Sequence, residues 1–255
     1  MTILRNLFSK ADICINLIGI LYEQKKGNTF KNIHIAFPSL LAQLSKEYKL
    51  KQFIHISALG INEAEDSNYA KTKLEGEANI QKYFPNATIL RPSIVYSVDD
   101  NFTTNFMSIL NKLPIFPLYY GGKTKFMPIH CSDLTDIISH VIFNKIYAQI
   151  IECVGPETIT FKQIICKLLT QIQKKRLLLP FPFFAANLSA LFFELFPKPI
   201  LTRDQLRLLK YHNIPSGKYK TNFQIGAPSN RFFDKELKKY SYMWMEGGQF
   251  SKKNK

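Results

Sequence analysis

The segment from residue 53 to residue 94 constrains the fold of this chain most strongly, because its pattern predicts a strand, a helix and a second strand. It begins with the apolar run FIHIS, which ends at Ser57, continues with SNYAKTKLEGE, and closes with the apolar run ATILRP. Two apolar strands joined by a helix are typical of a parallel sheet covered by helices on both faces. Proline lacks the N–H group that a central ladder needs, so we expect the second strand to stop at Arg91 and Pro92.

The rest of the chain continues this alternation. We expect strands at residues 13–20, 52–57, 88–91 and 149–154, and helices at residues 31–48, 69–83, 103–113 and 132–143. Two later segments, Thr160-x-x-Gln163 and Thr202-x-x-Gln205, have the form of a capping box and predict helix starts. Residues 114–122, rich in proline, glycine and aromatic residues, predict a loop that is either a substrate-side lid or a surface connection.

Tyr69 and Lys73 stand four residues apart in the central predicted helix, so they share one face of it. A free phenol has a pKa of about 10 and is a poor base at neutral pH, but a neighbouring cation stabilises the phenolate and lowers that pKa. With the hydroxyl of Ser57 nearby, the pair suits proton transfer to or from a carbonyl or alcohol oxygen. The alternative is that Tyr69 only packs and that Lys73 is a solvated helix lysine.

The Tyr-x-x-x-Lys spacing alone is a weak signal, because it also occurs at Tyr22 and Tyr119. Tyr22 follows a predicted strand directly, and its lysine runs into a glycine. Tyr119 leads into a pair of glycines, which predicts a turn. Only Tyr69 opens a long helical segment after a strand that ends in serine.

Four motifs together resemble the short-chain dehydrogenase/reductase superfamily in its extended and atypical branch, which includes proteins like the NAD-dependent epimerases and dehydratases. The motifs are NLIG at residues 16–19, HISALG at 55–60, YAKTK at 69–73 and RPSIVY at 91–96. The later stretch LLLPFPFFAANLSALFFELFPKPILTRDQL, residues 177–206, is similar to the corresponding part of the NAD(P)H-binding accessory subunit of respiratory complex I and its bacterial homologues. The resemblance extends from about residue 11 to about residue 245.

This resemblance implies an α/β fold, a Rossmann-like parallel sheet with helices on both faces and a small, mostly helical C-terminal lobe. The expected division is a partial NAD(P)-binding core at residues 1–155, a substrate or partner lobe at 156–246, and a disordered tail at 247–255. Neither G-x-G-x-x-G nor G-x-x-G-x-x-G, the glycine patterns that bring the backbone to a pyrophosphate, occurs in the sequence. The resemblance implies that residues 11–20 correspond to the fourth strand of the family, so its first two or three β-α units are expected to be missing, through truncation, a misplaced start codon or gene decay.

The family pattern also implies roles for individual residues. Tyr69 would be the general acid/base, Lys73 the cation that lowers its pKa and contacts the ribose, and Ser57 the group that orients the substrate oxygen. The implied cofactor is NAD or NADP, and its binding is expected to be weakened because the glycine motif is missing. The residues implied to bind it are Asn16, Leu17, Ile18, Gly19, Ser57, Tyr69, Lys73, Pro92, Ser93 and Ile94.

Three functions follow from the resemblance. The first is an accessory or assembly-type protein of complex I (NADH:ubiquinone oxidoreductase), with the nucleotide in a structural role and complex I subunits as partners. The second is an active NAD(P)-dependent oxidoreductase or epimerase that uses Tyr69 and Lys73. The third is a decayed fragment without cofactor binding or a stable fold.

Composition bears on partners and location. The chain has 46% hydrophobic residues, enough for a core, and a net charge of +15, which suits anionic lipid, an acidic protein or nucleic acid. The lysines are spread over several predicted helices and no nucleic-acid-binding module is recognised, so we expect no nucleic-acid partner. The four cysteines lie in apolar contexts without a C-x-x-C pair and are expected to be buried, reduced thiols. Histidines such as His55 and His130 are expected to pack or to form hydrogen bonds, and no metal site is expected.

Residues 177–201 form the most membrane-like stretch, but four prolines and a glutamate interrupt it. A spanning helix needs about 20 predominantly apolar residues. The stretch therefore predicts a short amphipathic helix at residues 183–196, which either covers the core of the lobe or docks on a partner or the membrane surface. Because no signal peptide is visible, the expected location is cytoplasmic, with possible peripheral contact at the inner face of the cytoplasmic membrane.

Overall fold

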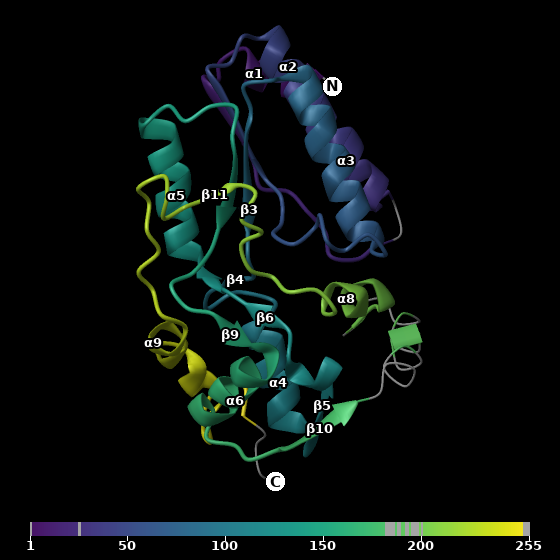
Figure 1. Cartoon of the computed structure of the whole chain (residues 1–255), viewed down its shortest axis with the longest axis vertical. Coiled ribbons are helices and arrows are strands. Elements are labelled where there is room, and N and C mark those ends of the chain that lie inside the picture. Colours follow the sequence, from purple (N-terminus) through teal and green to yellow (C-terminus); the bar gives the residue numbers. More distant parts are fainter. Residues whose placement is uncertain are drawn as a thin grey trace.

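The computed structural model of the chain describes residues 2–24, 27–181, 187, 190, 191, 194, 199 and 201–251. Within these residues the main sheet has five parallel strands in the order β1, β2, β3, β8, β11, of which β3 and β11 are labelled in Figure 1. The strands are β1 (Ile13–Asn16), β2 (Gln52–Ile56), β3 (Thr88–Pro92), β8 (Ile150–Cys153) and β11 (Lys220–Thr221). Neighbours in this order are far apart in the sequence, so each parallel pair needs a crossover connection.

Helices cover both faces of this sheet, as Figure 1 shows. On one face α2 (Phe37–Glu47) and α3 (Asn68–Tyr83) share a buried cluster with Phe53 of β2. On the other face α5 (Cys131–Phe143) shares a cluster with Ile54, the next residue of β2. Successive strand residues point to opposite faces, which explains why adjacent apolar residues serve two cores. The predicted Rossmann-like α/β fold is confirmed.

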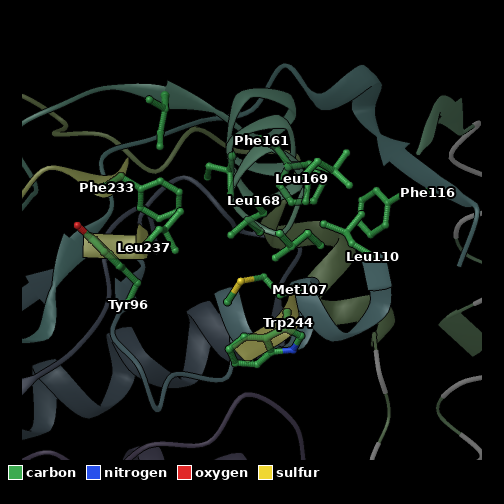
Figure 2. Close-up of a cluster of buried hydrophobic side chains, with 14 of the residues drawn as sticks. Tyr96, Met107, Leu110, Phe116, Phe161, Leu168, Leu169, Phe233, Leu237 and Trp244 are labelled. Atoms are coloured by element: carbon green, nitrogen blue, oxygen red, sulfur yellow. The ribbon is translucent and has the colours of Figure 1, made fainter. Parts of the chain in front are cut away.

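A second core lies below the sheet in the view of Figure 1 and is shown in Figure 2. It is built by α4 (Thr103–Lys112), α6 (Phe161–Gln171), α9 (Phe233–Lys238) and the 3-10 helix η3 (Ser241–Trp244). Its buried members include Met107, Leu110, Phe161, Leu168 and Trp244. Members of this core come from both sides of residue 155, and the division of the chain at that residue stays a prediction.

Short strand pairs frame the second core. They are β4 (Val95–Tyr96) with β7 (Ile129–His130), β6 (Lys125–Phe126) with β9 (Ile159–Thr160), and β5 (Ile115–Tyr119) with β10 (Leu177–Phe181). The prediction that residues 114–122 form a loop is therefore wrong for β5, although the 3-10 helix η2 (Tyr120–Gly122) does make a turn. The partner of β5 lies some 60 residues later in the chain, and no local pattern reveals such a pairing.

Two predicted elements are shorter or differently wound than expected. The first strand ends at Asn16 because the side chain of Asn16 accepts the N–H group of Ile18, at 3.1 Å, and turns the chain. The helix predicted at residues 31–48 begins as the π-helix η1 (Lys31–Ala36) and continues as α2. Pro38, in the first turn of α2, has no N–H group for an α-helical bond, and Phe37 N–H instead reaches back five residues to Asn32.

The helix caps follow the sequence closely. Both predicted capping boxes are present, Thr160 with Gln163 before α6 and Thr202 with Gln205 before α8 (Arg203–Leu208). The tail from residue 247, predicted to be disordered, is described as far as Ser251 and makes hydrogen bonds there, although Phe250 is 47% exposed. Its Phe250 carbonyl accepts the side-chain N–H of Asn111 at 3.0 Å. Residues 252–255 lie outside the described residues.

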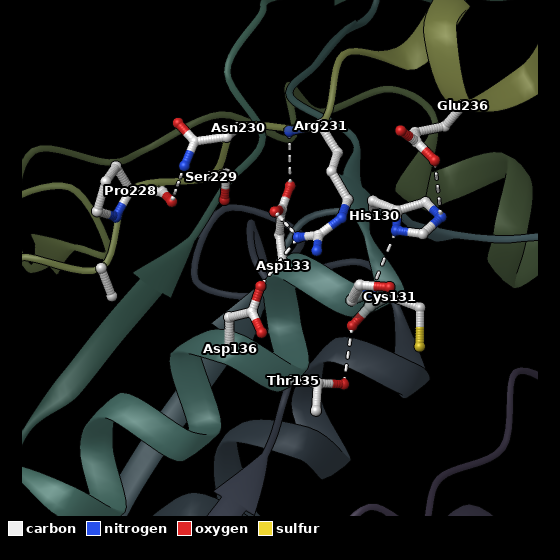
Figure 3. Close-up of polar contacts among 12 residues, drawn as sticks. His130, Cys131, Asp133, Thr135, Asp136, Pro228, Ser229, Asn230, Arg231 and Glu236 are labelled. Carbon is white, nitrogen blue, oxygen red and sulfur yellow. Dashed lines mark hydrogen bonds and ion pairs between the residues drawn. The ribbon is translucent and has the colours of Figure 1, made fainter.

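A polar cluster fastens the C-terminal segment to α5, as shown in Figure 3. The Nδ1 atom of His130 accepts the N–H group of Ser132 and caps α5, so the expected hydrogen-bonding role of His130 is confirmed. Asp133 accepts the backbone N–H of Arg231 at 3.1 Å and also binds its guanidinium, which reaches Asp136 at 2.9 Å. These contacts hold the chain in place just before α9.

The four cysteines are free thiols, but only Cys153 is buried. Cys131 and Cys166 lie on the outward faces of α5 and α6, so the prediction of burial is wrong for both. The amphipathic helix predicted at residues 183–196 lies mainly outside the described residues. No helix in the described part of the chain is long and apolar enough to cross a bilayer.

Candidate nucleotide site

The predicted site residues at the start of the chain gather where strands β1 and β2 end beside α3. Asn16 is the last residue of β1, Ser57 follows the last residue of β2, and Lys73 lies one turn after the start of α3. The carboxyl ends of parallel strands form the edge at which open α/β sheets bind their ligands. The chain therefore brings these three polar side chains to the position expected for a nucleotide.

Lys73 is the buried cation of this site, with 4% of its surface exposed. Its Nζ atom donates a hydrogen bond to the carbonyl of Ile56 at 3.2 Å. A Cβ atom built on Gly19 would lie 3.2 Å from the same Nζ, so the loop after β1 passes directly over the ammonium group. Burial lowers the pKa of Lys73 to about 8, and the charge of Glu77 partly opposes this effect. Lys73 is thus an ammonium ion at neutral pH, with one of its three N–H groups used by Ile56.

Two other buried polar atoms in this site have no partner among the described residues. One is the hydroxyl of Ser57, and the other is Nε2 of His55. The amide nitrogen of Asn16 lies 3.0 Å from Nδ1 of His55 and donates to it, which places the ring proton on Nε2. A buried polar group without a partner is destabilising by about 1–3 kcal/mol. The pair of hydroxyl and imidazole N–H is therefore suited to a ligand that offers hydrogen-bonding oxygens.

His34, on η1, ties the loop after β1 to the helix layer. Its Nε2 atom accepts the N–H group of Ile20 at 3.2 Å, and its Nδ1 atom lies 3.1 Å from the hydroxyl of Thr72. Burial lowers the pKa of His34 to about 4, with a further contribution from the charge of Lys73. The same two causes, burial first, hold the pKa of His55 well below its ordinary value. Both rings are therefore neutral at physiological pH.

Tyr69 lies on α3 but is packed more tightly than a general base requires. The edge of its ring meets His34 at 5.2 Å between centroids and Phe30 at 6.1 Å. Burial raises the pKa of Tyr69 to about 12, and the charge of Asp204 adds to the shift. The expectation that Lys73 lowers the pKa of Tyr69 is therefore wrong. The phenol is held in its protonated form.

Asp204, the second residue of α8, joins the C-terminal segment to the start of α3. Its carboxylate accepts hydrogen bonds from the hydroxyl of Ser67 at 2.8 Å and from the N–H groups of Asn68 at 2.8 Å and Tyr69 at 3.0 Å. A negative charge at a helix N-terminus is stabilising because it satisfies N–H groups that have no partner within the helix. Leu208, also on α8, packs with Tyr69 on a small buried cluster. This segment therefore covers one side of Tyr69.

A buried ion pair fixes α3 against the end of β3. Arg91 donates from Nε to Glu77 Oε1 at 2.9 Å and from Nη2 to Oε2 at 2.5 Å, and each of the two side chains is only 4% exposed. The guanidinium also lies 4.8 Å from the ring centroid of Tyr219. Since Glu77 is one turn beyond Lys73 on α3, the ion pair of Glu77 with Arg91 helps to fix the position of Lys73 relative to the strand ends.

The remaining predicted cofactor residues are spread more widely. Leu17 and Ile18 lie in the loop after β1, and both side chains are exposed. Pro92 ends β3, and its carbonyl accepts the N–H group of Leu59 at 2.9 Å. The hydroxyl of Ser93 donates to the side chain of Asn213 at 2.6 Å, and Ile94 packs against the second core. The structure thus brings Asn16, Gly19, Ser57 and Lys73 together, while Pro92, Ser93 and Ile94 lead into the lower half of the chain.

Sequence reasoning missed the functional placement of three residues. His55 is two residues before Ser57 in the same strand, so its position beside the site could have been inferred from strand alternation. His34 and Asp204 reach the site from η1 and α8, and no spacing in the sequence links either of them to Tyr69. A cavity of about 340 Å³ also lies beside Gly60, three residues after Ser57 in the chain. Its lining includes Gly60, Arg91, Glu152, Tyr211, His212 and Ser216.

No known family model matches this chain. It is 29% identical over 158 residues to NADH dehydrogenase [ubiquinone] 1 alpha subcomplex subunit 9, mitochondrial, of Dictyostelium discoideum, a match that covers 62% of this chain and 43% of that protein. It is 27% identical over 167 residues to the mitochondrial NADH-ubiquinone oxidoreductase 40 kDa subunit of Neurospora crassa, covering 65% of this chain and 43% of that protein. The matched part is thus less than half the length of these relatives.

Solved structures share the fold at lower identity. UDP-glucuronic acid 4-epimerase from Bacillus cereus, in complex with UDP-glucuronic acid and NAD, has a TM-score of 0.66 at 20% identity and covers 93% of this chain and 77% of its own. The dTDP-glucose 4,6-dehydratase DesIV from Streptomyces venezuelae, with NAD bound, has a TM-score of 0.66 at 13% identity and covers 97% of this chain and 79% of its own. Sequence and fold agree with the predicted resemblance: the chain is similar in sequence to subunits of mitochondrial NADH dehydrogenase, and it shares its fold with the NAD-bound structures of an epimerase and a dehydratase.

Proposed function

We propose that this chain is an NAD(P)-binding accessory or assembly-type protein of respiratory complex I, in which the nucleotide has a structural role. The observation that carries the proposal is the buried set of Asn16, His55, Ser57 and Lys73 at the strand ends, with Ser57 Oγ and His55 Nε2 unpartnered among the described residues. The sequence similarity to complex I subunits supports the choice of partner.

The site fits one half of a dinucleotide better than the other. Lys73 and Ser57 offer donors to ribose hydroxyls, and His55 offers a further N–H group. The sequence contains no glycine-rich turn that would bring backbone N–H groups to a pyrophosphate. The proposal therefore places the nicotinamide-ribose half at these residues and assigns no residue to the adenosine half. When bound, NAD or NADP would supply hydride chemistry.

The surroundings of Tyr69 favour a structural role over turnover. An efficient general base has a pKa near the working pH. A phenol with a pKa of about 12 is almost never ionised at pH 7, so the phenolate that would act as the base is scarcely present. The ring is packed by Phe30 and His34, and α8 covers another side through Leu208. These contacts suit a rigid nucleotide platform.

Thermal unfolding with and without NADH and NADPH tests the proposal, because a ligand that binds only the folded state raises the midpoint. We expect a rise for the unsubstituted protein and for Lys71→Met, which removes an exposed lysine from the same helix. We expect no rise for Lys73→Met. A cooperative transition without any shift would point to a nucleotide-free partner role. The absence of a transition would point to the third function, a decayed fragment.

An active oxidoreductase or epimerase is the second candidate. The cavity beside Gly60 favours it, since this space of about 340 Å³ begins three residues after the predicted catalytic Ser57 and could hold a substrate. This candidate predicts a nicotinamide absorbance change that is lost in Tyr69→Phe. A structural role predicts no such change, even where nucleotide raises the midpoint of unfolding.

The partner and the location belong to the same proposal. A complex I role predicts that the protein co-purifies with respiratory subunits and with membranes, from a location on the inner face of the cytoplasmic membrane. The proposed division of labour gives nucleotide binding to residues 1–155 and partner binding to residues 156–246. Co-purification that survives Lys73→Met would show that the partner is bound independently of the nucleotide.

A further inference from the structure

The outward face of strands β5 and β10 is an uncovered apolar surface within the described part of the chain. The two strands are parallel, with Ile115 opposite Leu177 and Pro117 opposite Leu179. Alternate residues of β5, Phe116 and Leu118, point inward and are buried in or beside the second core. Ile115, Leu177 and Leu179 point the other way and are 48%, 56% and 41% exposed. Leu113, just before β5, is 49% exposed.

Positive charges gather at one end of this face. Because the strands run in the same direction, the residues that precede them lie side by side, and Leu177 N–H donates to the carbonyl of Pro114 at 3.1 Å. Lys112 precedes β5, and Lys174, Lys175 and Arg176 precede β10. Arg176 is held there by hydrogen bonds to the carbonyls of Leu110 at 2.7 Å and Asn111 at 3.2 Å, at the end of α4.

A groove between these basic segments shows the same imbalance of charge. It has a volume of about 350 Å³ and is lined by Lys112, Lys174 and Arg176 together with a single carboxylate, that of Glu246. Each of the two basic segments continues directly into exposed aliphatic side chains. The face therefore combines a cationic rim with an apolar surface.

The occupant that complements both features is a membrane surface with anionic lipids. Lysines close to an anionic headgroup layer are attracted to it, and exposed aliphatic side chains gain by entering the boundary between headgroups and acyl chains. A second copy of the chain would bring the same positive charges together and would be repelled. An acidic protein would complement the basic residues, but it would not explain why exposed leucines lie beside them.

We infer that the outward face of β5 and β10, with the basic residues 112 and 174–176 at its end, docks on an anionic lipid bilayer. This inference rests on the peripheral location proposed above and names the surface responsible for it. The face is separate from the strand ends that hold Lys73. Lipid binding and nucleotide binding can therefore succeed or fail independently.

Co-sedimentation with vesicles tests the inference, using phosphatidylcholine alone or mixed with phosphatidylglycerol in equal parts. We expect binding only to the mixed vesicles and weaker binding at high salt, because salt screens the lysines. Lys174→Gln/Lys175→Gln should weaken binding by about five-fold for each lysine. Leu177→Ser/Leu179→Ser should weaken it by at least about ten-fold.

Matched control variants test whether lipid binding depends on this face or on the overall charge and the exposed apolar residues of the chain. Lys71→Gln/Lys82→Gln removes two exposed lysines from α3, and Ile3→Ser/Leu7→Ser removes two exposed apolar residues from α1 (Thr2–Phe8). Both should bind the mixed vesicles like the unsubstituted protein. Lys174 is half-buried and the other substituted side chains are exposed, so circular dichroism and the thermal midpoint should change little.

Several results would overturn the inference. Equal binding to neutral vesicles would remove the role of the basic rim. Unchanged binding in both variants of the β5 and β10 face would place any lipid contact elsewhere. A dimer in light scattering that dissociates in Leu177→Ser/Leu179→Ser would show that a second copy covers the face. A nucleotide-induced rise in the thermal midpoint would still support the proposed nucleotide site in each of these cases.

Discussion

Removing one partner of the buried ion pair between Arg91 and Glu77 should be among the most destabilising single changes in the chain. Both side chains are 4% exposed, and two hydrogen bonds of 2.9 and 2.5 Å join them. Glu77→Gln leaves the guanidinium buried without a counter-charge, which is destabilising by about 3–5 kcal/mol. A domain of this kind is stable by only about 5–15 kcal/mol, so such a loss removes a large share of the total.

Replacing both partners should behave differently, because no buried charge is then left uncompensated. We expect Glu77→Leu/Arg91→Met to recover most of the loss, since apolar replacements of buried ion pairs are often neutral or stabilising. Urea unfolding of the two single variants and the double variant gives the coupling energy directly. Glu75→Gln, an exposed change on the same helix, should stay within about 0.5 kcal/mol of the unsubstituted protein. A loss below about 1 kcal/mol in Glu77→Gln, or simple additivity in the cycle, would refute the reasoning.

Three further predictions concern the packing around the site. Gly76→Ala should be destabilising by about 1–3 kcal/mol in urea unfolding, because its Cβ would lie 1.9 Å from the carbonyl oxygen of His34 and force η1 away from α3; no loss would mean that η1 yields freely. The pKa of His34 is lowered to about 4, so the unfolded chain binds more protons than the folded chain between about pH 6.5 and 4. The free energy of unfolding should therefore fall by up to about 3 kcal/mol as the pH drops through that window. His34→Gln should flatten this pH dependence, and an unchanged slope would contradict the assignment. Asp204→Ala removes the acceptor of Ser67, Asn68 and Tyr69, so it should lower the free energy of unfolding by about 1–3 kcal/mol and speed proteolysis near α8. Asp204→Asn should retain part of that stability. Equal losses in the two variants would show that the charge, not the acceptor geometry, is decisive.

The parts of the fold that could be predicted from the sequence are those with local signals. The strands β2 and β3 and the helix α3 end within one residue of their predicted bounds because apolar runs, a proline and a serine mark them. The two capping boxes are local motifs for the same reason, since the side chain and the N–H group it accepts are three residues apart. The pairing of β5 with β10 has no such signal. It depends on a partner about 60 residues away, so the local sequence of β5 predicts a loop instead.

The candidate site likewise has features that local sequence signals predict and features that depend on distant residues. The cluster of Asn16, Ser57 and Lys73 follows from strand ends and helix spacing, which the sequence displays. The pKa of Tyr69 does not, because it depends on burial by Phe30 and His34 and on a carboxylate from α8. A spacing of four residues can place a cation on the same helix face as a phenol, but it cannot show which of them is desolvated.

The charge states of the pocket limit what it can do at neutral pH. His34 and His55 are neutral there and Tyr69 is protonated, so Lys73 is charged while these three neighbours are not. Each neutral state depends on burial, and each histidine also responds to the ammonium of Lys73, since a second positive charge beside it would be strongly repelled. A pocket with one fixed cation and several neutral donors can hold an electron-rich ligand firmly. Neither its histidines nor its phenol is poised to accept a proton at neutral pH, and this supports the proposed structural role of the nucleotide.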